Sequence, residues 1–310
     1  MSELYVIATI SNPLRFKSRY KLYEEFRDRL LHDGAILYTI ELAFDGQDFA
    51  VTQNDNGHHF QFRSQHLFWH KENLVNVALQ HLPPDWKHVA WLDADIAFAR
   101  HDWVQETLNQ LKHHAFVQMF SHAIYLGPNY EPLKLYEGFA YRHLKGRADE
   151  AAQSSSGAKP AGLNKEYGQM GGAWAARREA LEAVGGLIDW SILGANDYYM
   201  ALALIGAIDP QSTRMPGSNY ANTLMAWQER CQKRIGSDIG YVNNSLFHYW
   251  HGSRKDRGYG TRWHILVDHQ FDPAVDLRTN AQGLLELTDA KPELRDAIRN
   301  YFTVRNEDSA

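Results

Sequence analysis

The sequence predicts an α/β protein with a mostly parallel central sheet flanked by helices. Strand-like and helix-like segments alternate over the first hundred residues, which is the order typical of βαβ units. Hydrophobic residues make up 44% and charged residues 22% of the 310 residues, the balance of a globular protein with a full core. Turn residues such as Ser11-Asn12-Pro13 and Pro83-Pro84 separate the segments.

Hydrophobic periodicity places the first elements. Strands are predicted at residues 4–10, 35–44 and 89–92, and helices at residues 14–31 and 65–82. The proline pair that follows residue 82 stops the second helix. Ligands of such sheets bind beyond the carboxyl ends of the strands, so the functional residues are expected there.

The second half of the chain is less regular. Residues 148–162 are rich in Ala, Ser, Gly and Pro without periodicity, which indicates a flexible loop or lid. Regular elements return at residues 169–206. We therefore expect one domain over residues 1–267 and a C-terminal helical extension over residues 268–310, which includes a helical pattern at 292–302.

Charge and composition exclude several classes of protein. Lys and Arg number 32 against 37 Asp and Glu, a net charge of -5, so contact with nucleic acid would have to be local. The single cysteine, Cys231, cannot form an intramolecular disulfide. The apolar run at residues 4–10 is too short for a signal peptide, and no stretch approaches the ~20 apolar residues of a membrane span. We expect a cytoplasmic protein.

Two acids follow the predicted strand at residues 89–92. Asp93 and Asp95 are two positions apart, and in an extended chain such side chains point the same way. Both carboxylates are then placed to hold one divalent cation and the phosphates it carries. The alternative is a pair of solvated turn acids, since a D-x-D pattern is weak by itself.

Neighbouring motifs give the acid pair a family resemblance. Lys71 and Asn76 on the preceding helix, followed by the acid pair, resemble the helix-then-DxD block of GT-A fold nucleotide-sugar glycosyltransferases, particularly the family-2-like group. Residues 170–187 (MGGAWAARREALEAVGGL) are similar to that family's Gly-Gly acceptor loop and the helix after it. Residues 194–202 lie where the family carries two adjacent acids, of which Asp197 is kept and Asn196 replaces the other. The resemblance covers about residues 1–265.

The resemblance implies a GT-A-like, Rossmann-type fold and a metal-dependent transfer of sugar from a nucleotide sugar, most often a UDP-sugar. It implies Asp95 as the main metal ligand, with Asp93 assisting the metal or the ribose. Lys71, Asn76, Gly171 and Gly172 are expected around the donor, and the cofactor is expected to be Mn²⁺ or Mg²⁺.

The resemblance also implies that Asp197 is the catalytic base. A carboxylate that removes the proton of the acceptor hydroxyl implies inversion at the anomeric carbon. The alternative is that Asp197 is a helix N-terminal acid that complements the dipole, with Asn196 as the cap. Trp174, in the same block, is expected either to stack on a sugar or to pack in the core.

Residues 247–263 combine two histidines, four cations and several aromatic residues. The resemblance implies His251 as the third metal ligand and Arg254 and Lys255 as partners of the diphosphate, while His248 is the other candidate. An imidazole beside carboxylates favours Mn²⁺ over Mg²⁺.

The same segment allows a nucleic-acid interpretation, because cations and aromatic rings can neutralise phosphates and stack on bases. Some bacteriophage enzymes of this broad fold glycosylate hydroxymethylated pyrimidines in DNA, so the acceptor is expected to be a glycan or modified DNA. The rival hypotheses are a nucleic-acid-binding protein without catalysis and a nucleotidyltransferase that uses the same metal site. A solvated basic loop is the simplest alternative.

Four further positions are predicted from the strand ends. Ser11, Asn12 and Arg15 follow the first strand, where the family's nucleotide base lies. Glu41, near the end of the second strand, is expected to meet a ribose or base. Ordinary turn or cap chemistry is the alternative for each.

Overall fold

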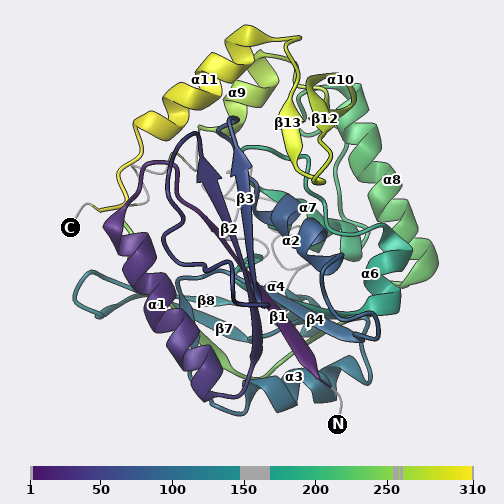
Figure 1. The fold of residues 1–310 in the computed structure, drawn as a ribbon. Coiled ribbons are helices and arrows are strands. Elements are labelled where there is room, and N and C mark those ends of the chain that lie inside the picture. Colours follow the sequence, from purple (N-terminus) through teal and green to yellow (C-terminus); the bar gives the residue numbers. More distant parts are fainter. Residues whose placement is uncertain (1–2, 147–167, 254–257, 259–260, 309–310) are drawn as a thin grey trace.

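The computed structural model describes residues 3–146, 168–253, 258 and 261–308 of the chain. These residues form a layered α/β structure in which helices cover both faces of a seven-stranded sheet (Figure 1). The predicted class, with a mostly parallel central sheet, is confirmed. The predicted loop at residues 148–162 lies outside the described residues, as do Arg254 and Lys255.

The central sheet has the strand order β10-β6-β9-β4-β1-β2-β3. Its strands are β1 (Leu4–Ser11), β2 (Ile36–Phe44), β3 (His59–Ser64), β4 (His88–Leu92), β6 (Phe116–Gln118), β9 (Ala173–Arg177) and β10 (Ile239–Tyr241). Neighbouring strands run parallel except around β9, which is antiparallel to both β4 and β6. The carboxyl ends of β1, β2 and β4 therefore share one edge of the sheet.

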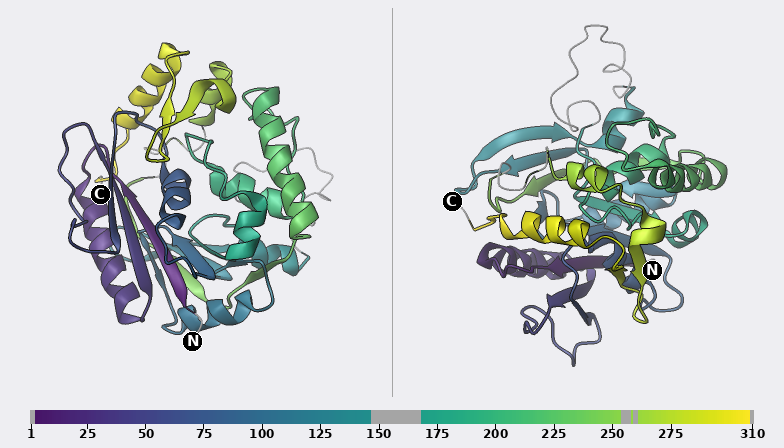
Figure 2. Two further views of the ribbon diagram at one scale, coloured as in Figure 1. Left: turned by 45° about the vertical axis from the view of Figure 1, so that its right-hand side comes forward. Right: turned by 90° about the horizontal axis from the view of Figure 1, so that it is seen from above.

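Side chains of β1 alternate between two hydrophobic cores, one on each face of the sheet. Tyr5 and Ile7 pack into the core under α2, α6, α7 and α8, whereas Val6 and Ala8 pack into the core under α1 and α3. These helices are α1 (Lys17–His32), α2 (Lys71–Leu79), α3 (Trp103–Leu111), α6 (Arg178–Val184), α7 (Asn196–Leu204) and α8 (Ser218–Arg234). Figure 2 shows α1 and the α2, α6 and α8 group on opposite sides of the sheet. A strand buried on both faces requires a continuous apolar run, which is the pattern in the sequence.

A second sheet brings two distant segments to the end of β4. It has the order β5-β11-β7-β8, with β5 (Ile96–Phe98), β7 (His122–Leu126), β8 (Pro132–Glu137) and β11 (Ser245–His248). β5 and β11 are antiparallel, and His248 lies opposite Ile96. The Tyr249 amide also donates to the Asp95 carbonyl at 2.9 Å. These contacts join the acid turn to the histidine segment.

Two elements differ from the sequence expectation. The second predicted helix begins at Lys71 instead of residue 65, because the residues before it are held by tertiary contacts such as the Trp69 amide to the Ile192 carbonyl, 2.7 Å. The strand β3 was not expected, since no strand is predicted between residues 44 and 65. In the structure β3 pairs in parallel with β2 and extends the sheet.

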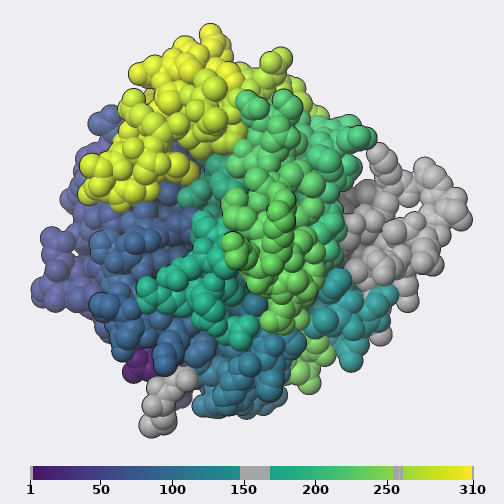
Figure 3. Space-filling model, turned by 90° about the vertical axis from the view of Figure 1, so that its right-hand side faces the viewer, coloured from purple at the N-terminus to yellow at the C-terminus, as the bar shows by residue number. Residues whose placement is uncertain are grey.

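The C-terminal segment packs against α2 and α8. It contains α9 (Trp263–Asp268), α10 (Pro273–Asp276), the antiparallel pair β12 (Leu277–Thr279) and β13 (Leu285–Leu287), and α11 (Pro292–Thr303). Asn73 of α2 joins the turn between these strands: its Nδ2 donates to the Gly283 carbonyl and its Oδ1 accepts from the Leu285 amide. Figure 3 shows this yellow segment lying directly against α8.

α4 (Phe139–Leu144) completes the described helices. Within the described residues, none of the helices is both long and apolar enough to cross a membrane.

Candidate functional site

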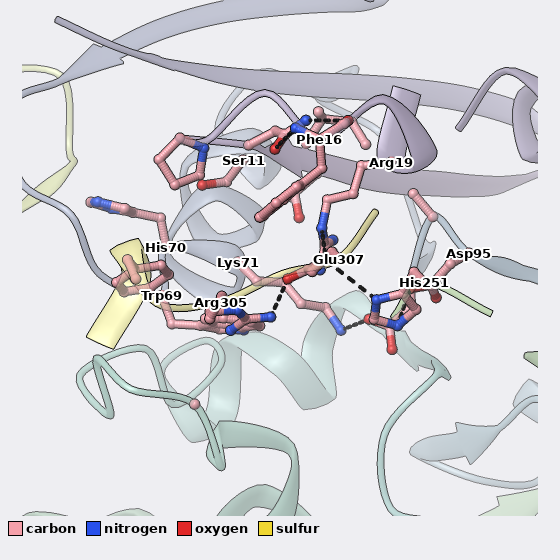
Figure 4. A pocket seen from close by; sticks show the side chains of 18 of the residues that line it. Ser11, Phe16, Arg19, Trp69, His70, Lys71, Asp95, His251, Arg305 and Glu307 are labelled. Atoms are coloured by element: carbon pink, nitrogen blue, oxygen red, sulfur yellow. Dashed lines mark hydrogen bonds and ion pairs between the residues drawn. The ribbon is translucent and has the colours of Figure 1, made fainter. Parts of the chain in front are cut away.

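A pocket lies at the carboxyl edge of the central sheet, where the sequence predicts the site. Its wall is built from the ends of β1 and β4, the starts of α2 and α7, and the segments after β11 and α11 (Figure 4). Among the predicted residues, those that line it are Ser11, Asn12, Lys71, Asp93, Asp95, Asp197, His248 and His251. Residues that are far apart in the chain therefore meet because of the parallel topology.

The two acids of the DxD pattern have different partners. The chain turns at residues 94 and 95 instead of continuing the strand, so the extended geometry expected for Asp93 and Asp95 does not occur. The Asp93 carboxylate forms an ion pair with Lys71 Nζ, and its amide donates to the Gly172 carbonyl at 2.8 Å. The Asp95 carboxylate faces the two histidines.

Asp95, His248 and His251 form a group that could hold a metal ion. His251 Nε2 lies 3.2 Å from Asp95 Oδ2, and His248 Nε2 lies 3.8 Å from Asp95 Oδ1. One ligand atom from each residue lies within 4.8 Å of the others. Tyr125 stacks on His248, with ring centroids 4.4 Å apart, and fixes the plane of that imidazole. The structure therefore brings together both histidines that the sequence left as alternatives.

This donor set fits a divalent transition metal. One carboxylate and two imidazoles are harder to reconcile with Mg²⁺, which prefers an all-oxygen shell, than with Mn²⁺ or a similar ion. Both histidines are largely buried, His248 at 9% and His251 at 4% exposure, so their positions are fixed by packing. Asp93 is not a member of this group, since its carboxylate is engaged by Lys71.

A second cluster of charges joins α2 to α7. Burial opposes the charge of Lys71, but Asp93, Glu72 and Asp197 raise the pKa of its ammonium above the usual value. Burial raises the pKa of Asp197, Lys71 opposes that shift and Asp93 adds to it. Lys71 is thus a permanent cation, and Asp197 is a carboxylate with increased basicity.

Asp197 lies in the first turn of α7, whose cap residue is Ala195. Asp197 Oδ1 accepts from the Tyr198 amide at 2.8 Å. Asn196 is not the cap: its Oδ1 accepts from the Ser191 amide at 3.1 Å and its Nδ2 donates to Glu72 Oε2 at 2.8 Å. The assignment of Asn196 as the cap residue is therefore wrong, whereas the dipole role of Asp197 stays a prediction.

The first residue of the glycine pair packs against the Asp197 carboxylate of this cluster. A side chain at Gly171 would place its Cβ 2.1 Å from Asp197 Oδ2, so only glycine leaves room for the carboxylate. Gly172 has a φ of 106°, a conformation that favours glycine. Trp174 is 1% exposed and its Nε1 donates to the Met170 carbonyl at 2.6 Å. Trp174 therefore belongs to the core and does not stack on a sugar.

At the end of β1, Asn12 shapes the entrance to α1. Its Oδ1 accepts from the Phe16 amide at 3.0 Å and its Nδ2 donates to the Phe16 carbonyl at 2.9 Å. Ser11 lies beside it on the pocket wall. Asn12 thus holds the loop that borders the pocket.

Five of the predicted site residues that the structure describes do not line this pocket. Gly171 and Gly172 lie behind Asp197, in a separate small cavity. Arg15 is exposed, and its guanidinium donates to the Asp48 carbonyl. Glu41 accepts from the amides of residues 50–52 and from Thr52 Oγ1, so it fixes that loop. Asn76 bonds both backbone groups of Leu187 and the Asp189 carboxylate.

Several pocket residues were not predicted from the sequence. They are Arg19, Trp69, Glu72, Arg262, Arg305 and Glu307. The guanidinium groups of Arg262 and Arg305 lie over the Trp69 ring, at 5.4 Å and 4.7 Å from its centroid. Only Arg262 lies in a segment that the sequence marked as functional, the basic run at residues 247–263.

The buried carboxyl of Glu72 predicts a pH-dependent stability. Burial raises its pKa from 4.5 to about 7, against the opposing effect of Lys71. Between these values the folded protein holds a proton that the unfolded chain has released, so the free energy of unfolding falls as the pH rises through this window. At 1.36 kcal/mol per pKa unit, the free energy of unfolding decreases by at most about 3 kcal/mol.

We expect Glu72→Gln to remove this loss, because the amide keeps an acceptor for Asn196 and carries no charge. Urea unfolding at pH 5 and pH 8 measures the difference in the free energy of unfolding between the two pH values, with the surface substitution Glu182→Gln as the control. A Glu72→Gln protein with the same pH dependence as the wild type would contradict the assignment.

No family model and no curated protein sequence matches the chain. Among solved structures, it resembles Drosophila beta-1,4-galactosyltransferase 7 in complex with manganese, UDP-Gal and xylobiose, at 12% identity and a TM-score of 0.46, covering 96% of this chain and 99% of that one. It also resembles glucosyl-3-phosphoglycerate synthase from Mycobacterium tuberculosis, with Mn²⁺, UDP and phosphoglyceric acid, at 11% identity and a TM-score of 0.39, covering 87% and 77%. A third similar structure is mannosyl-3-phosphoglycerate synthase from Rubrobacter xylanophilus, at 12% identity and a TM-score of 0.40. The match covers 92% of this chain and 84% of that one.

These neighbours are of the class that the sequence resembles. Their identities and TM-scores are low, so the function proposed below is derived from the side chains of the site.

Proposed function

We propose that this protein is a metal-dependent glycosyltransferase that moves a sugar from a nucleotide sugar, a UDP-sugar, to an acceptor hydroxyl with inversion. One observation carries the proposal. The group of Asp95, His248 and His251 opens into the same pocket as Lys71 and Asp197. A metal-binding group, a fixed cation and a basic carboxylate are the parts that sugar transfer from a nucleotide needs.

Asp95, His248 and His251 would hold Mn²⁺. When bound, the ion supplies charge stabilisation to the departing diphosphate without any proton movement. Lys71 adds a permanent positive charge beside it, because its pKa is raised by three carboxylates. Asp93 orients that ammonium through their ion pair. The predicted donor contacts at Ser11, Asn12, Gly172, Arg254 and Lys255 remain part of this proposal.

Asp197 is proposed as the general base. Its carboxylate lines the pocket and packs against Gly171, and its raised pKa increases its affinity for a proton. Asp197 would take the acceptor proton as the hydroxyl oxygen bonds to the anomeric carbon and the bond to the nucleoside diphosphate breaks on the opposite face, a single displacement that inverts the anomeric configuration.

The close approach of Gly171 to Asp197 gives a prediction. We expect Gly171→Ala to displace the carboxylate and to lower kcat about a hundredfold, the cost of a misplacement of about 1 Å. Steady-state kinetics on the best donor measures it, with Gly46→Ala as the control because a Cβ there meets nothing within 4 Å. A Gly171→Ala enzyme with wild-type kcat would show that Asp197 does not act from this position.

A panel of nucleotide sugars, with and without Mn²⁺, tests the proposed function. We expect one nucleoside diphosphate to be released in a Mn²⁺-dependent reaction. Pyrophosphate as the product would indicate a nucleotidyltransferase instead. Failure to bind any nucleotide sugar in the presence of Mn²⁺ would reject the transferase and favour nucleic-acid binding by residues 248–263.

The acceptor is proposed to be a glycan or the hydroxymethyl group of a modified pyrimidine in DNA. Once the donor is known, each acceptor is supplied in turn and the anomeric configuration of the product is read by NMR. A product of the same anomeric configuration as the donor would reject inversion.

A further inference from the structure

After α11 the chain runs back into the pocket and passes beside the metal-binding group. Glu307 is 3% exposed and lies on the pocket wall next to His251 (Figure 4). In sequence it is 56 residues beyond that histidine. A carboxylate this deeply buried needs partners that compensate for its lost hydration.

Among the described residues, Glu307 has three such partners. Its carboxylate forms ion pairs with Arg19 of α1 and with Arg305, and its Oε2 lies 3.3 Å from His251 Nδ1. The two arginines compensate the buried carboxylate, and its Oε2 is placed to accept the Nδ1 proton of His251.

One imidazole thus lies between two carboxylates. His251 Nδ1 faces Glu307 and His251 Nε2 faces Asp95 Oδ2 at 3.2 Å. A neutral imidazole carries one N–H, so donation from Nδ1 to Glu307 leaves the Nε2 lone pair directed toward Asp95. The Nε2 lone pair and the Asp95 carboxylate would then both be available to hold a cation.

The tail is fixed in this place by further contacts. The Asp308 carboxylate accepts from the amides of Lys17 and Ser18 at the start of α1, at 3.0 and 2.9 Å. A Cβ on Gly252 would lie 2.6 Å from the Asn306 carbonyl oxygen and 2.8 Å from Glu307 Cα. The glycine after His251 therefore allows the tail to pack directly on the histidine segment.

We propose that Glu307 is a positioning residue for the metal centre, which sets the tautomer and the ring orientation of His251. The C-terminal tail is then an integral part of the metal site. This inference rests on the metal centre of the proposed function.

Two variants of nearly equal size test the inference. Glu307→Gln and Glu307→Met both remove the charge and both lose the ion pairs with Arg19 and Arg305. Only glutamine keeps an oxygen that accepts the His251 Nδ1 proton. Asp276→Asn is the control, because Asp276 is a buried carboxylate of the C-terminal segment, paired with Lys291 and remote from the histidines.

The readout is the Kd for Mn²⁺ without donor, measured from the EPR signal of free Mn²⁺. Loss of a carboxylate or carbonyl partner of a metal-ligating histidine costs about 10–100-fold in metal affinity. We expect Glu307→Met to bind Mn²⁺ at least about tenfold more weakly than Glu307→Gln, and Asp276→Asn to bind like the wild type. Pulsed EPR should show the imidazole nitrogen coupling of His251 weakened in Glu307→Met alone.

Equal Mn²⁺ affinity in the glutamine and methionine variants would overturn the inference, since only glutamine supplies an acceptor for the His251 Nδ1 proton. That result leaves the proposed function intact when the wild type binds Mn²⁺ and transfers sugar. A wild-type protein that does not bind Mn²⁺ would reject the metal centre and the inference together.

Discussion

Replacing Asp95 with asparagine is expected to abolish Mn²⁺ binding and to lower kcat/KM for the nucleotide sugar about a thousandfold. Asp95 is the only carboxylate in the described group that faces both His248 and His251. Its removal leaves two neutral imidazoles, which do not compensate the charge of a divalent ion. Loss of metal-ion stabilisation of a diphosphate costs several kcal/mol, and about 4 kcal/mol corresponds to a factor of a thousand.

The measurement is isothermal titration with Mn²⁺, followed by donor turnover at saturating metal. Asp102→Asn serves as the control, because Asp102 is an exposed acid just beyond β5 that pairs with Arg100. An Asp95→Asn protein that binds Mn²⁺ with the wild-type Kd would remove Asp95 from the metal centre. Retained turnover without Mn²⁺ would exclude a metal-dependent mechanism.

Hydrophobic periodicity was sufficient to predict β1, β2 and β4 of the central sheet, for physical reasons visible in β1 and β4. Both strands are buried on two faces, and their continuous apolar runs are compatible with few structures other than a buried strand. β3 is different, because only one of its faces carries large apolar residues and its polar residues resemble a loop. Its assignment depends on pairing with β2, which is a tertiary contact.

The position of the acid pair after a buried strand was predictable from the sequence, but its geometry was not. The separation of Asp93 from Asp95 depends on the turn after β4 and on the β5–β11 pairing that brings His248 to that turn. Glu307 carries no local signal at all, because its role depends on the tail folding back onto α1 and His251.

Glu41 and Asn76 show that the partner of a polar side chain also depends on tertiary structure. Polar residues near strand ends and on the helix before the acid pair were expected to meet a ligand. In the structure, both side chains form hydrogen bonds with backbone groups of the protein. A buried polar group must have a partner, and composition does not show whether a loop or a ligand supplies it.

Replacing Asp197 with asparagine is expected to lower kcat by about 10²–10⁴-fold, the usual contribution of a general base. Mn²⁺ and donor binding should stay close to wild type, since the amide keeps an oxygen for the Tyr198 amide and Asp197 is outside the metal-binding group. The carboxyl accepts a proton only when ionised, so wild-type kcat falls as the pH drops through its pKa. Burial raises that pKa above 3.8, which moves the acidic limb of the profile to a higher pH than for an ordinary aspartate.

The pH profile distinguishes a base from an acid that only complements the helix dipole. A base predicts that Asp197→Asn loses both kcat and the acidic limb, whereas the exposed acid Asp209, changed to asparagine as the control, keeps both. A dipole role predicts a destabilisation of about 0.3–1 kcal/mol with kcat unchanged. Thermal unfolding and kcat measured on the same preparations separate the two, because the first role changes the rate and the second changes only the stability.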